Sequence, residues 1–258
     1  MVFLLRIDLE SDKGIKEGVP KILSVLKKYN IKASFYVVMG GESNIIELIR
    51  YQKKLPGKRK ISIFSKKEVL RMILLPRDFT LKNRKILQRI LADGHELGIH
   101  GWKHREWSRG LENLNVRKAI RKAIRKYTQL FDRRPHSFCA PAFRMNQEVV
   151  KILSSEGIRV ISDFQGDSPK KVGDLINAPI TLRGKGNTPI IEYYVGKNYS
   201  DEEIFEKIIS NIKGKPYSSM YIHGLFECRE RIDLLEKLFK WLKKNKIKTE
   251  KIINVTNI

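Results

Sequence analysis

The sequence contains only two cysteines, Cys139 and Cys228, among its 258 residues. Two cysteines cannot build the disulfide framework of a small secreted domain, so we expect buried free thiols. No segment reaches the roughly 18 consecutive apolar residues of a membrane-spanning helix, and the N-terminus lacks the charged head and apolar stretch of a signal peptide. These absences predict a cytoplasmic protein, one that can rest peripherally on a membrane.

Acidic residues are scarce relative to basic ones. The chain has 28 Asp and Glu against 52 Lys and Arg, a formal net charge of +24. This charge favours anionic partners, namely nucleic acid, an acidic membrane surface or a phosphorylated substrate, without choosing among them. No zinc finger, helix-turn-helix or RNA-binding aromatic motif accompanies it, which makes nucleic acid the weaker alternative. A charged fraction of 31% with only five glutamines is typical of proteins from very hot environments.

Short apolar runs alternate with longer amphipathic segments, which is typical of repeated βα units around a parallel sheet. Val19, Ile22, Leu23 and Leu26 recur at helical spacing and predict one such helix. The expected strands are Val2–Ile7, Ala33–Met39, Glu96–Ile99, Ser137–Ala140, Arg159–Ser162, Ile190–Val195 and Ser219–Ile222. About seven βα units fit a barrel better than an open sheet. With no linker visible, we expect residues 1–258 to form a single catalytic domain.

The segment from about residue 41 to residue 80 breaks this rhythm, because it is too long for an ordinary βα loop. It contains a basic stretch, Lys53–Lys60, followed by an apolar stretch, Val69–Pro76. We interpret it as an insertion near the mouth of the barrel. A contact with lipid or phosphate and a small satellite core beneath solvated lysines are equally compatible with it.

The sharpest chemical signal is the pair His100 and His104, which follows the expected strand Glu96–Ile99. Residues four apart lie on one face of a helical turn, with Cβ atoms about 5–6 Å apart, so two imidazoles can converge on one metal ion. A purely structural pair is the alternative. The chain has only five histidines, and two of them at this spacing favour a metal site.

Carboxylates occupy alternate positions where the first strand ends, at Asp8, Glu10 and Asp12. One such carboxylate can bind a metal while another takes a proton from water. The competing interpretation, with equal weight, is a helix N-terminus decorated with acids.

Three further polar residues each follow an apolar run: Arg144, Asp163 and His223. The carboxyl ends of the strands of a parallel barrel form one rim, where active sites are built. Each residue alone is more often structural. Their shared position predicts that they line one mouth together with Asp8 and His100.

The order of these residues resembles the NodB-type polysaccharide deacetylases. The resemblance is carried by Asp8-x-Glu10, by Gly94-His-Glu-Leu-Gly-Ile-His100-x-x-x-His104, and by the later Arg144, Asp163 and His223. Leu5-Arg-Ile-Asp8, Gly18-Val-Pro20, Ala33-Ser-Phe35 and the tryptophans at 102 and 107 resemble, more narrowly, the branch of formamido-arabinose undecaprenyl-phosphate deformylases. The resemblance implies an α/β fold, a distorted (β/α) barrel with about seven parallel strands, and a metal-dependent amidohydrolase.

The resemblance also implies a role for each matching residue. Asp8 corresponds to the catalytic base, and Glu10, His100 and His104 to the ligands of one divalent metal ion. Arg144 corresponds to the arginine that orients the base, His223 to the general acid, and Asp163 to the aspartate that supports that acid. Zinc is the first choice for nitrogen and oxygen ligands, although cobalt, nickel, manganese and iron accept the same set.

The implied substrate is an N-formyl or N-acetyl amino sugar carried on a polyprenyl phosphate, with a soluble chitooligosaccharide as the alternative. Three departures concern the site. Glu10 stands where the family has Asp, Phe164-Gln165 where the deformylase branch has Thr-Arg, and of two acids after the late histidine only Glu227 remains. The departure at Glu10 makes a catalytically inactive sugar-binding barrel a further alternative. The retained base, histidine pair and late histidine argue against it.

Overall fold

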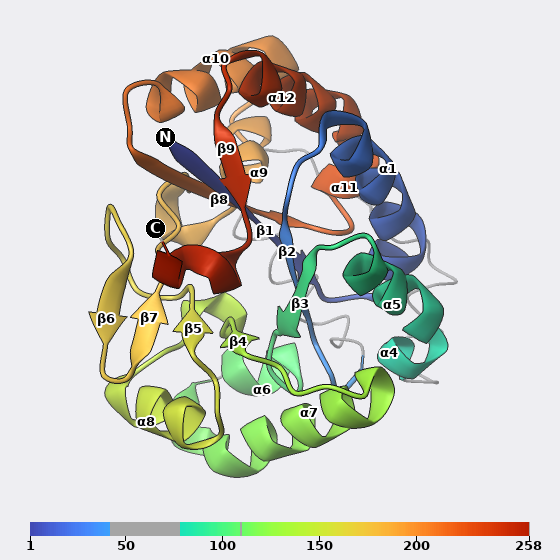
Figure 1. The fold of residues 1–258 in the computed structure, drawn as a ribbon, viewed down its shortest axis with the longest axis vertical. Helices are drawn as coiled ribbons and strands as arrows, with labels where there is room; N and C mark the ends of the chain where they lie inside the picture. Colours follow the sequence, from blue (N-terminus) through green and yellow to red (C-terminus); the bar gives the residue numbers. More distant parts are fainter. Residues whose placement is uncertain (42–77, 109, 258) are drawn as a thin grey trace.

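The computed structural model describes residues 1–41, 78–108 and 110–257. Its strands form one sheet that curls into a distorted barrel with helices outside it (Figure 1). The strands are β1 (Val2–Leu9), β2 (Ser34–Val37), β3 (Glu96–Ile99), β4 (Ser137–Phe138), β5 (Val160–Ile161), β6 (Lys170–Val172), β7 (Leu175–Asn177), β8 (Tyr217–His223) and β9 (Lys248–Glu250). The expected α/β barrel is therefore confirmed.

The helices follow the strands as βα units require. They are α1 (Val19–Tyr29), α4 (Phe79–Lys82), α5 (Arg84–Ala92), α6 (His104–Ser108), α7 (Val116–Phe131), α8 (Gln147–Ser155), α9 (Ile190–Val195), α10 (Asp201–Ile212), α11 (Glu227–Glu230) and α12 (Ile232–Lys244). The other helical segments are the π-helix η1 (Gly14–Gly18) and the 3₁₀ helices η2 (Leu111–Asn113), η3 (Pro141–Phe143), η4 (Lys185–Asn187) and η5 (Ile252–Asn257).

The sheet runs in the order β6-β7-β5-β4-β3-β2-β1-β8, and β9 pairs with the first residues of β1, from Val2 to Leu4. Every pairing within it is parallel except the β6–β7 hairpin. After β7 the chain returns to β8, because Leu182 forms a parallel bridge with Met220 and its amide donates to the carbonyl of Ser219. This return places the segment after β7 beside β8.

The central strand β1 is buried along its whole length. A parallel strand covered on both faces is expected to be a nearly continuous apolar run, which is what Val2–Leu5 provide. The helix predicted from Val19, Ile22, Leu23 and Leu26 is present as α1, which buries these four side chains together with Val25. The two cysteines are free and buried, as expected.

One expected strand is wrong. The segment Ile190–Val195 forms the short helix α9. Its β-branched and aromatic residues favour extended structure, but Pro189 precedes the first helical residue and the helix packs beside β8. Leu175–Asn177 takes the sheet position instead, because it pairs with β5.

The C-terminal segment η5 closes the end of the barrel where the strands begin. The buried carboxylate of Glu96, the first residue of β3, accepts hydrogen bonds from Ser34 Oγ (2.5 Å), the Ile253 amide (2.9 Å) and Ser137 Oγ. Burial raises the pKa of Glu96. The opposite end, where the strands finish, is left for the functional site.

The predicted insertion at 41–80 lies largely outside the described residues, and with it the stretches Lys53–Lys60 and Val69–Pro76. Its last two residues begin α4. In the parts of the chain that are described, no helix is long and apolar enough to cross a bilayer.

Candidate functional site

Three charged side chains occur at alternate positions along and just beyond β1. Because successive strand residues point to opposite faces, Arg6 and Asp8 share a face, and Glu10 follows immediately after the strand ends at Leu9. Asp8 is the register partner of His223, the last residue of β8. The sheet therefore sets the base and acid candidates side by side.

The two histidines converge, but not on a single helical turn as the spacing predicts. His100 follows β3, and His104 begins α6. Gly101 between them has φ +73°, the left-handed region that favours glycine. The chain therefore turns sharply after His100, and the two imidazole rings lie with centroids 5.6 Å apart.

Glu10, His100 and His104 fit a metal ion. Oε1 of Glu10 lies 3.1 Å from Nε2 of each histidine. Nδ1 of His100 lies 2.8 Å from the carbonyl oxygen of Cys139, which can only accept, so Nδ1 carries the proton. In the neutral imidazole, the lone pair of Nε2 then faces a carboxylate oxygen. A cation between them relieves that repulsion, and a backbone carbonyl behind a ligand histidine is the usual arrangement at metal sites.

Glu10 is held in its charged form. Burial alone would raise its pKa, but His104 and His223 lower the pKa well below the ordinary range. Its side chain keeps 29% of its exposure, which places it at the mouth of the barrel. An ionised carboxylate beside two imidazoles is a donor set that divalent first-row metals accept.

Asp8 is oriented by Arg6. The Arg6 guanidinium donates from Nε to Oδ1 and from Nη2 to Oδ2 of Asp8, both at 2.8 Å, and from Nη1 to the carbonyl of Ser162. Both side chains are almost fully buried, at 1% and 3% exposure. Arg144, expected to make this contact, is exposed after the turn η3. A bidentate fork of this kind fixes the orientation of a carboxylate.

Aromatic rings enclose the Arg6 guanidinium. Its Cζ lies 4.8 Å from the ring centroid of Phe143 and 5.6 Å from that of Tyr221. Phe143 reaches this place from a strained turn, because Ala142 and Phe143 have φ of +54° and +55°. Residues other than glycine rarely adopt this backbone region, and such strain is concentrated at functional sites.

Asp163 lies behind Arg6, on the Asp8 side of the site. Its Oδ1 accepts from the Ala140 amide at 2.8 Å and lies 3.8 Å from Nη1 of Arg6. Burial raises the pKa of Asp163 to about 7, and Arg6 offsets part of that rise. The support expected for His223 comes from another residue.

That residue is Glu192 on α9. Nδ1 of His223 lies 2.6 Å from Oε1 of Glu192, while Nε2 lies 3.8 Å from Oε1 of Glu10. Burial alone would lower the pKa of His223, but the carboxylates of Glu192 and Glu10 outweigh it and raise the pKa well above the ordinary value. The imidazole is therefore held protonated, with Nε2 toward the metal ligands.

Glu227 completes this side of the site. Its Oε2 accepts from the backbone amide of His223 at 2.8 Å, and its side chain is fully buried. Burial, with the nearby charge of Glu192, raises the pKa of Glu227 to about 8. A neutral carboxyl group at this position limits the negative charge around His223.

The structure thus gathers Asp8, Glu10, His100, His104 and His223 at one mouth, and places Asp163 one layer deeper. It adds Arg6 and Glu192, which the sequence reasoning missed. A signal was present for both, since each is a charged residue inside an otherwise apolar run, Leu4–Ile7 and Ile190–Val195. A charge buried there requires a partner.

Comparison with known proteins assigns the class. Residues 7–161, more than half of the chain, match the family model for polysaccharide deacetylase. The chain belongs to the polysaccharide deacetylase family and is, by class, a hydrolase of N-acyl amides. Over 255 residues it is 25% identical to the probable 4-deoxy-4-formamido-L-arabinose-phosphoundecaprenol deformylase ArnD of Shewanella sediminis, covering 94% of this chain and 82% of that protein.

Solved structures share the fold. A probable polysaccharide deacetylase from Pseudomonas aeruginosa PAO1 superimposes with a TM-score of 0.70 at 15% identity, covering 99% of this chain and 89% of that chain. A CE4 family pseudoenzyme from Bacillus anthracis superimposes with a TM-score of 0.59 at 15% identity. The comparison covers 98% of this chain but only 64% of that longer one. At these identities the likeness establishes the barrel alone.

Proposed function

We propose that this protein hydrolyses the N-acyl amide of an amino sugar with the help of one divalent metal ion. The observation that carries the proposal is the approach of Glu10 Oε1 to within 3.1 Å of both His100 Nε2 and His104 Nε2, beside an Arg6-oriented Asp8. Zinc is the preferred ion because two imidazoles and one carboxylate leave an open position, as catalytic zinc sites do. When bound, the ion lowers the pKa of a water ligand and polarises the acyl oxygen.

Asp8 is the proposed base. Arg6 holds both of its oxygens by hydrogen bonds of 2.8 Å. Oδ2 of Asp8 lies 3.8 Å from Nε2 of His100, so the carboxylate borders the metal ligands without belonging to the triad. In this position it accepts the proton of the attacking water.

His223 is the proposed acid. The imidazole is held protonated because Glu192 lies against Nδ1. Nε2 lies on the side of Glu10, 3.8 Å from its Oε1, and from there it gives its proton to the departing sugar amine. A base oriented by Arg6 and an acid held protonated by Glu192 form the arrangement that acid–base catalysis requires. In this scheme Asp163 supports the base through Arg6, and Arg144 faces the substrate from the rim.

We propose a lipid-linked substrate, because the Shewanella relative is named as a deformylase of a formamido sugar carried on phosphoundecaprenol. The net charge of +24 favours an anionic, phosphate-bearing ligand. A soluble chitooligosaccharide is the alternative. The two substrates separate in an amine-release assay, in which the N-formyl sugar on a polyprenyl phosphate should be cleaved and the free N-acetyl oligosaccharide should not.

The metal is tested first. Purified protein should carry about one divalent ion per chain, and the double variant His100→Ala with His104→Ala should lose it, because two of three ligands are removed. Elemental analysis after dialysis measures this. His136→Ala is the matched control, since His136 is exposed and should leave the metal content unchanged. Stoichiometric metal in the double variant would remove Glu10, His100 and His104 from the metal site.

The pH profile tests Glu192. The carboxylate raises the pKa of His223, so the acid form persists to higher pH and the rate falls only as pH rises through that raised pKa. Glu192→Gln removes the charge, and the alkaline limb of kcat/KM should move to lower pH by about one unit or more. Asp163→Asn should leave that limb in place. If Asp163→Asn moved the alkaline limb and Glu192→Gln did not, Asp163 would be the support of His223.

A further inference from the structure

The outward face of α7 carries charge of one sign. Within its 16 residues, VRKAIRKAIRKYTQLF, six are basic and none is acidic. By contrast α10, with 12 residues, carries four acids and one lysine. Two repeats of Arg-Lys-Ala-Ile set this pattern, because they place basic residues four positions apart on one face and Ala and Ile on the other.

Five of these cations are exposed, and they share one side of the helix. They are Arg117, Lys118, Arg121, Lys122 and Arg125. At about 100° per residue they occupy an arc of roughly 140°, and they extend along about 12 Å of the axis. The opposite side is buried in the core through Ala119, Ile120, Ala123, Ile124 and Tyr127. The orientation of the cationic face is therefore fixed by the fold.

Few acids neutralise this face. Arg117 and Arg121 share the single carboxylate of Glu156, at 3.6 and 2.7 Å, so the pair keeps a net positive charge. Lys118 and Arg125 make no ion pair with any residue that the structure describes. Neighbouring cations without acidic partners repel one another, and an anionic partner would lower this electrostatic free energy.

The face also reaches the mouth of the barrel. Nζ of Lys122 lies 4.3 Å from the ring centroid of Trp102, and Trp102 comes two residues after His100. Lys126 contacts the same ring at 5.5 Å and an acid, Asp78. A planar partner that covers α7 would therefore lie next to the entrance to the metal site.

We propose that the α7 face docks the protein on a bilayer that bears anionic lipid headgroups. The inference rests on the proposed function in one respect: a sugar carried on polyprenyl phosphate is presented at such a surface. A row of long, flexible cations held parallel to the surface fits a plane of headgroups, toward which the aliphatic stems can also lie. Nucleic acid offers the same charge, but the five exposed side chains of the α7 face are all basic. The one ring described beside them, Trp102, already contacts Lys122 and Lys126, so the face lacks the row of aromatic stacking groups that accompanies charge in single-strand binders.

Sedimentation with vesicles tests the proposal. The parent should bind vesicles containing phosphatidylglycerol at low salt, bind phosphatidylcholine vesicles weakly, and lose the anionic binding as salt shortens the screening length. The double variant Lys118→Gln with Arg125→Gln keeps helix-forming residues. It should lower the partition coefficient roughly tenfold or more, since each cation at such a surface contributes on the order of fivefold.

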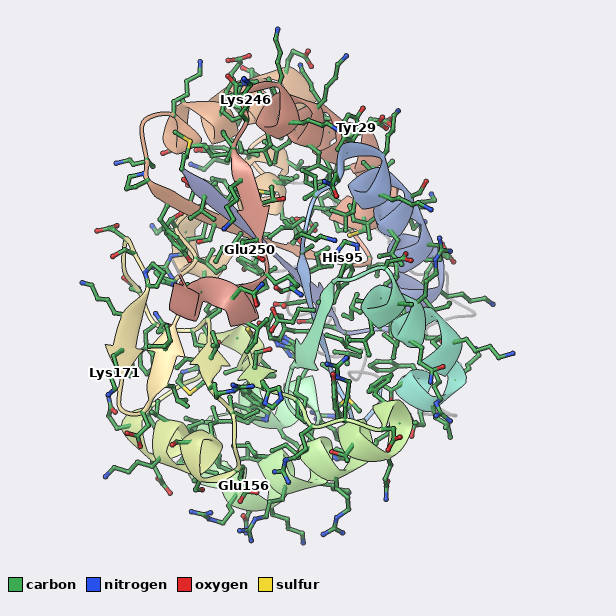
Figure 2. All side chains as sticks on the ribbon, viewed as in Figure 1. Tyr29, His95, Glu156, Lys171, Lys246 and Glu250 are labelled. Carbon is green, nitrogen blue, oxygen red and sulfur yellow. The ribbon has the colours of Figure 1, made fainter. Side chains whose placement is uncertain are left out.

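The matched control removes the same charge from the other end of the molecule. Lys243→Gln with Lys244→Gln alters exposed lysines at the end of α12. Figure 1 shows α12 and α7 at opposite ends, and Figure 2 places Lys246, just beyond α12, far from Glu156 beside α7. This variant should change the partition less than about twofold. Equal losses in the two variants would show that net charge alone acts and would overturn the proposal.

Two further arms separate the possible outcomes. Titration with duplex DNA in the same buffer should give weaker binding than the vesicles give, and preferential binding of DNA would overturn the membrane assignment. Hydrolysis of a soluble N-formyl amino sugar should be equal in the parent and in the α7 variant. A loss of vesicle binding with unchanged hydrolysis supports the α7 surface, whereas absent hydrolysis in every form counts against the proposed function alone.

Discussion

Replacing Asp8 by Asn should lower kcat/KM for amide hydrolysis by about 10²- to 10⁴-fold while the metal content stays near one ion per chain. The amide cannot take a proton from the attacking water, and general base catalysis contributes about that factor. The contact with Arg6 is weakened as well, because the new amide nitrogen meets a guanidinium N–H where an oxygen used to accept. Amine release together with elemental analysis measures both effects.

The control is Asp12→Asn, which makes the same chemical change four residues further along. Asp12 is also buried, but its oxygens accept from Asn83 at 2.6 Å and from Lys82 at 3.0 Å, away from the histidine pair. It should keep most of the hydrolytic activity. If Asp8→Asn instead strips the metal, Asp8 is the ligand, and Glu10 becomes the candidate base.

The substitution at Glu10 bears on the same assignment. The extra methylene of Glu, relative to the Asp of the family, brings Oε1 to equal distances of 3.1 Å from both histidines. It also brings that oxygen within 3.8 Å of His223 Nε2. The longer side chain thus spans between the metal ligands and the acid, which accounts for the low pKa of Glu10. A sugar-binding barrel without catalysis would not need three imidazoles around one carboxylate.

The parts of the fold that sequence predicts best are those where one local rule decides the outcome. The buried strand Val2–Ile7 is apolar apart from Arg6, and the helix α1 has a single apolar face, so both are present as expected. Ile190–Val195 shows where the rule fails. Its residue types favour a strand, but the position of the segment was decided by packing against β8 and by the reach of Glu192 to His223.

The site divides in the same way. The side chains that follow strand ends could be placed at one mouth, because a parallel barrel brings those ends together. The partners behind them could not be assigned, because contacts such as Glu192 with His223 join residues 31 positions apart through tertiary packing. Arg6 could have been assigned from the sequence, because residues two apart on a strand share a face and Arg6 stands two positions before Asp8.

Replacing Arg6 should have the largest effect on stability. Arg6→Gln leaves Asp8 and Asp163 buried without their cation, and breaking a buried ion pair by removing one partner costs about 3–5 kcal/mol. The free energy of unfolding, measured in urea at neutral pH, should fall by that amount, and hydrolysis should be lost with it. The pKa of Asp163, already raised to about 7 by burial, should rise further, since the offsetting guanidinium is gone.

Arg6→Lys separates orientation from charge. A lysine keeps the positive charge but cannot form the bidentate fork to Oδ1 and Oδ2 of Asp8. We therefore expect kcat to fall strongly, while the free energy of unfolding falls less than it does in Arg6→Gln. Arg144→Lys is the comparison, because Arg144 is exposed and its replacement should change stability by no more than about 0.5 kcal/mol. Loss of kcat in Arg144→Lys but not in Arg6→Lys would show that Arg144, and not Arg6, orients the base Asp8. The expected order, with Arg6 more sensitive, follows from the two hydrogen bonds of 2.8 Å that only the guanidinium of Arg6 makes to Asp8 among the described residues.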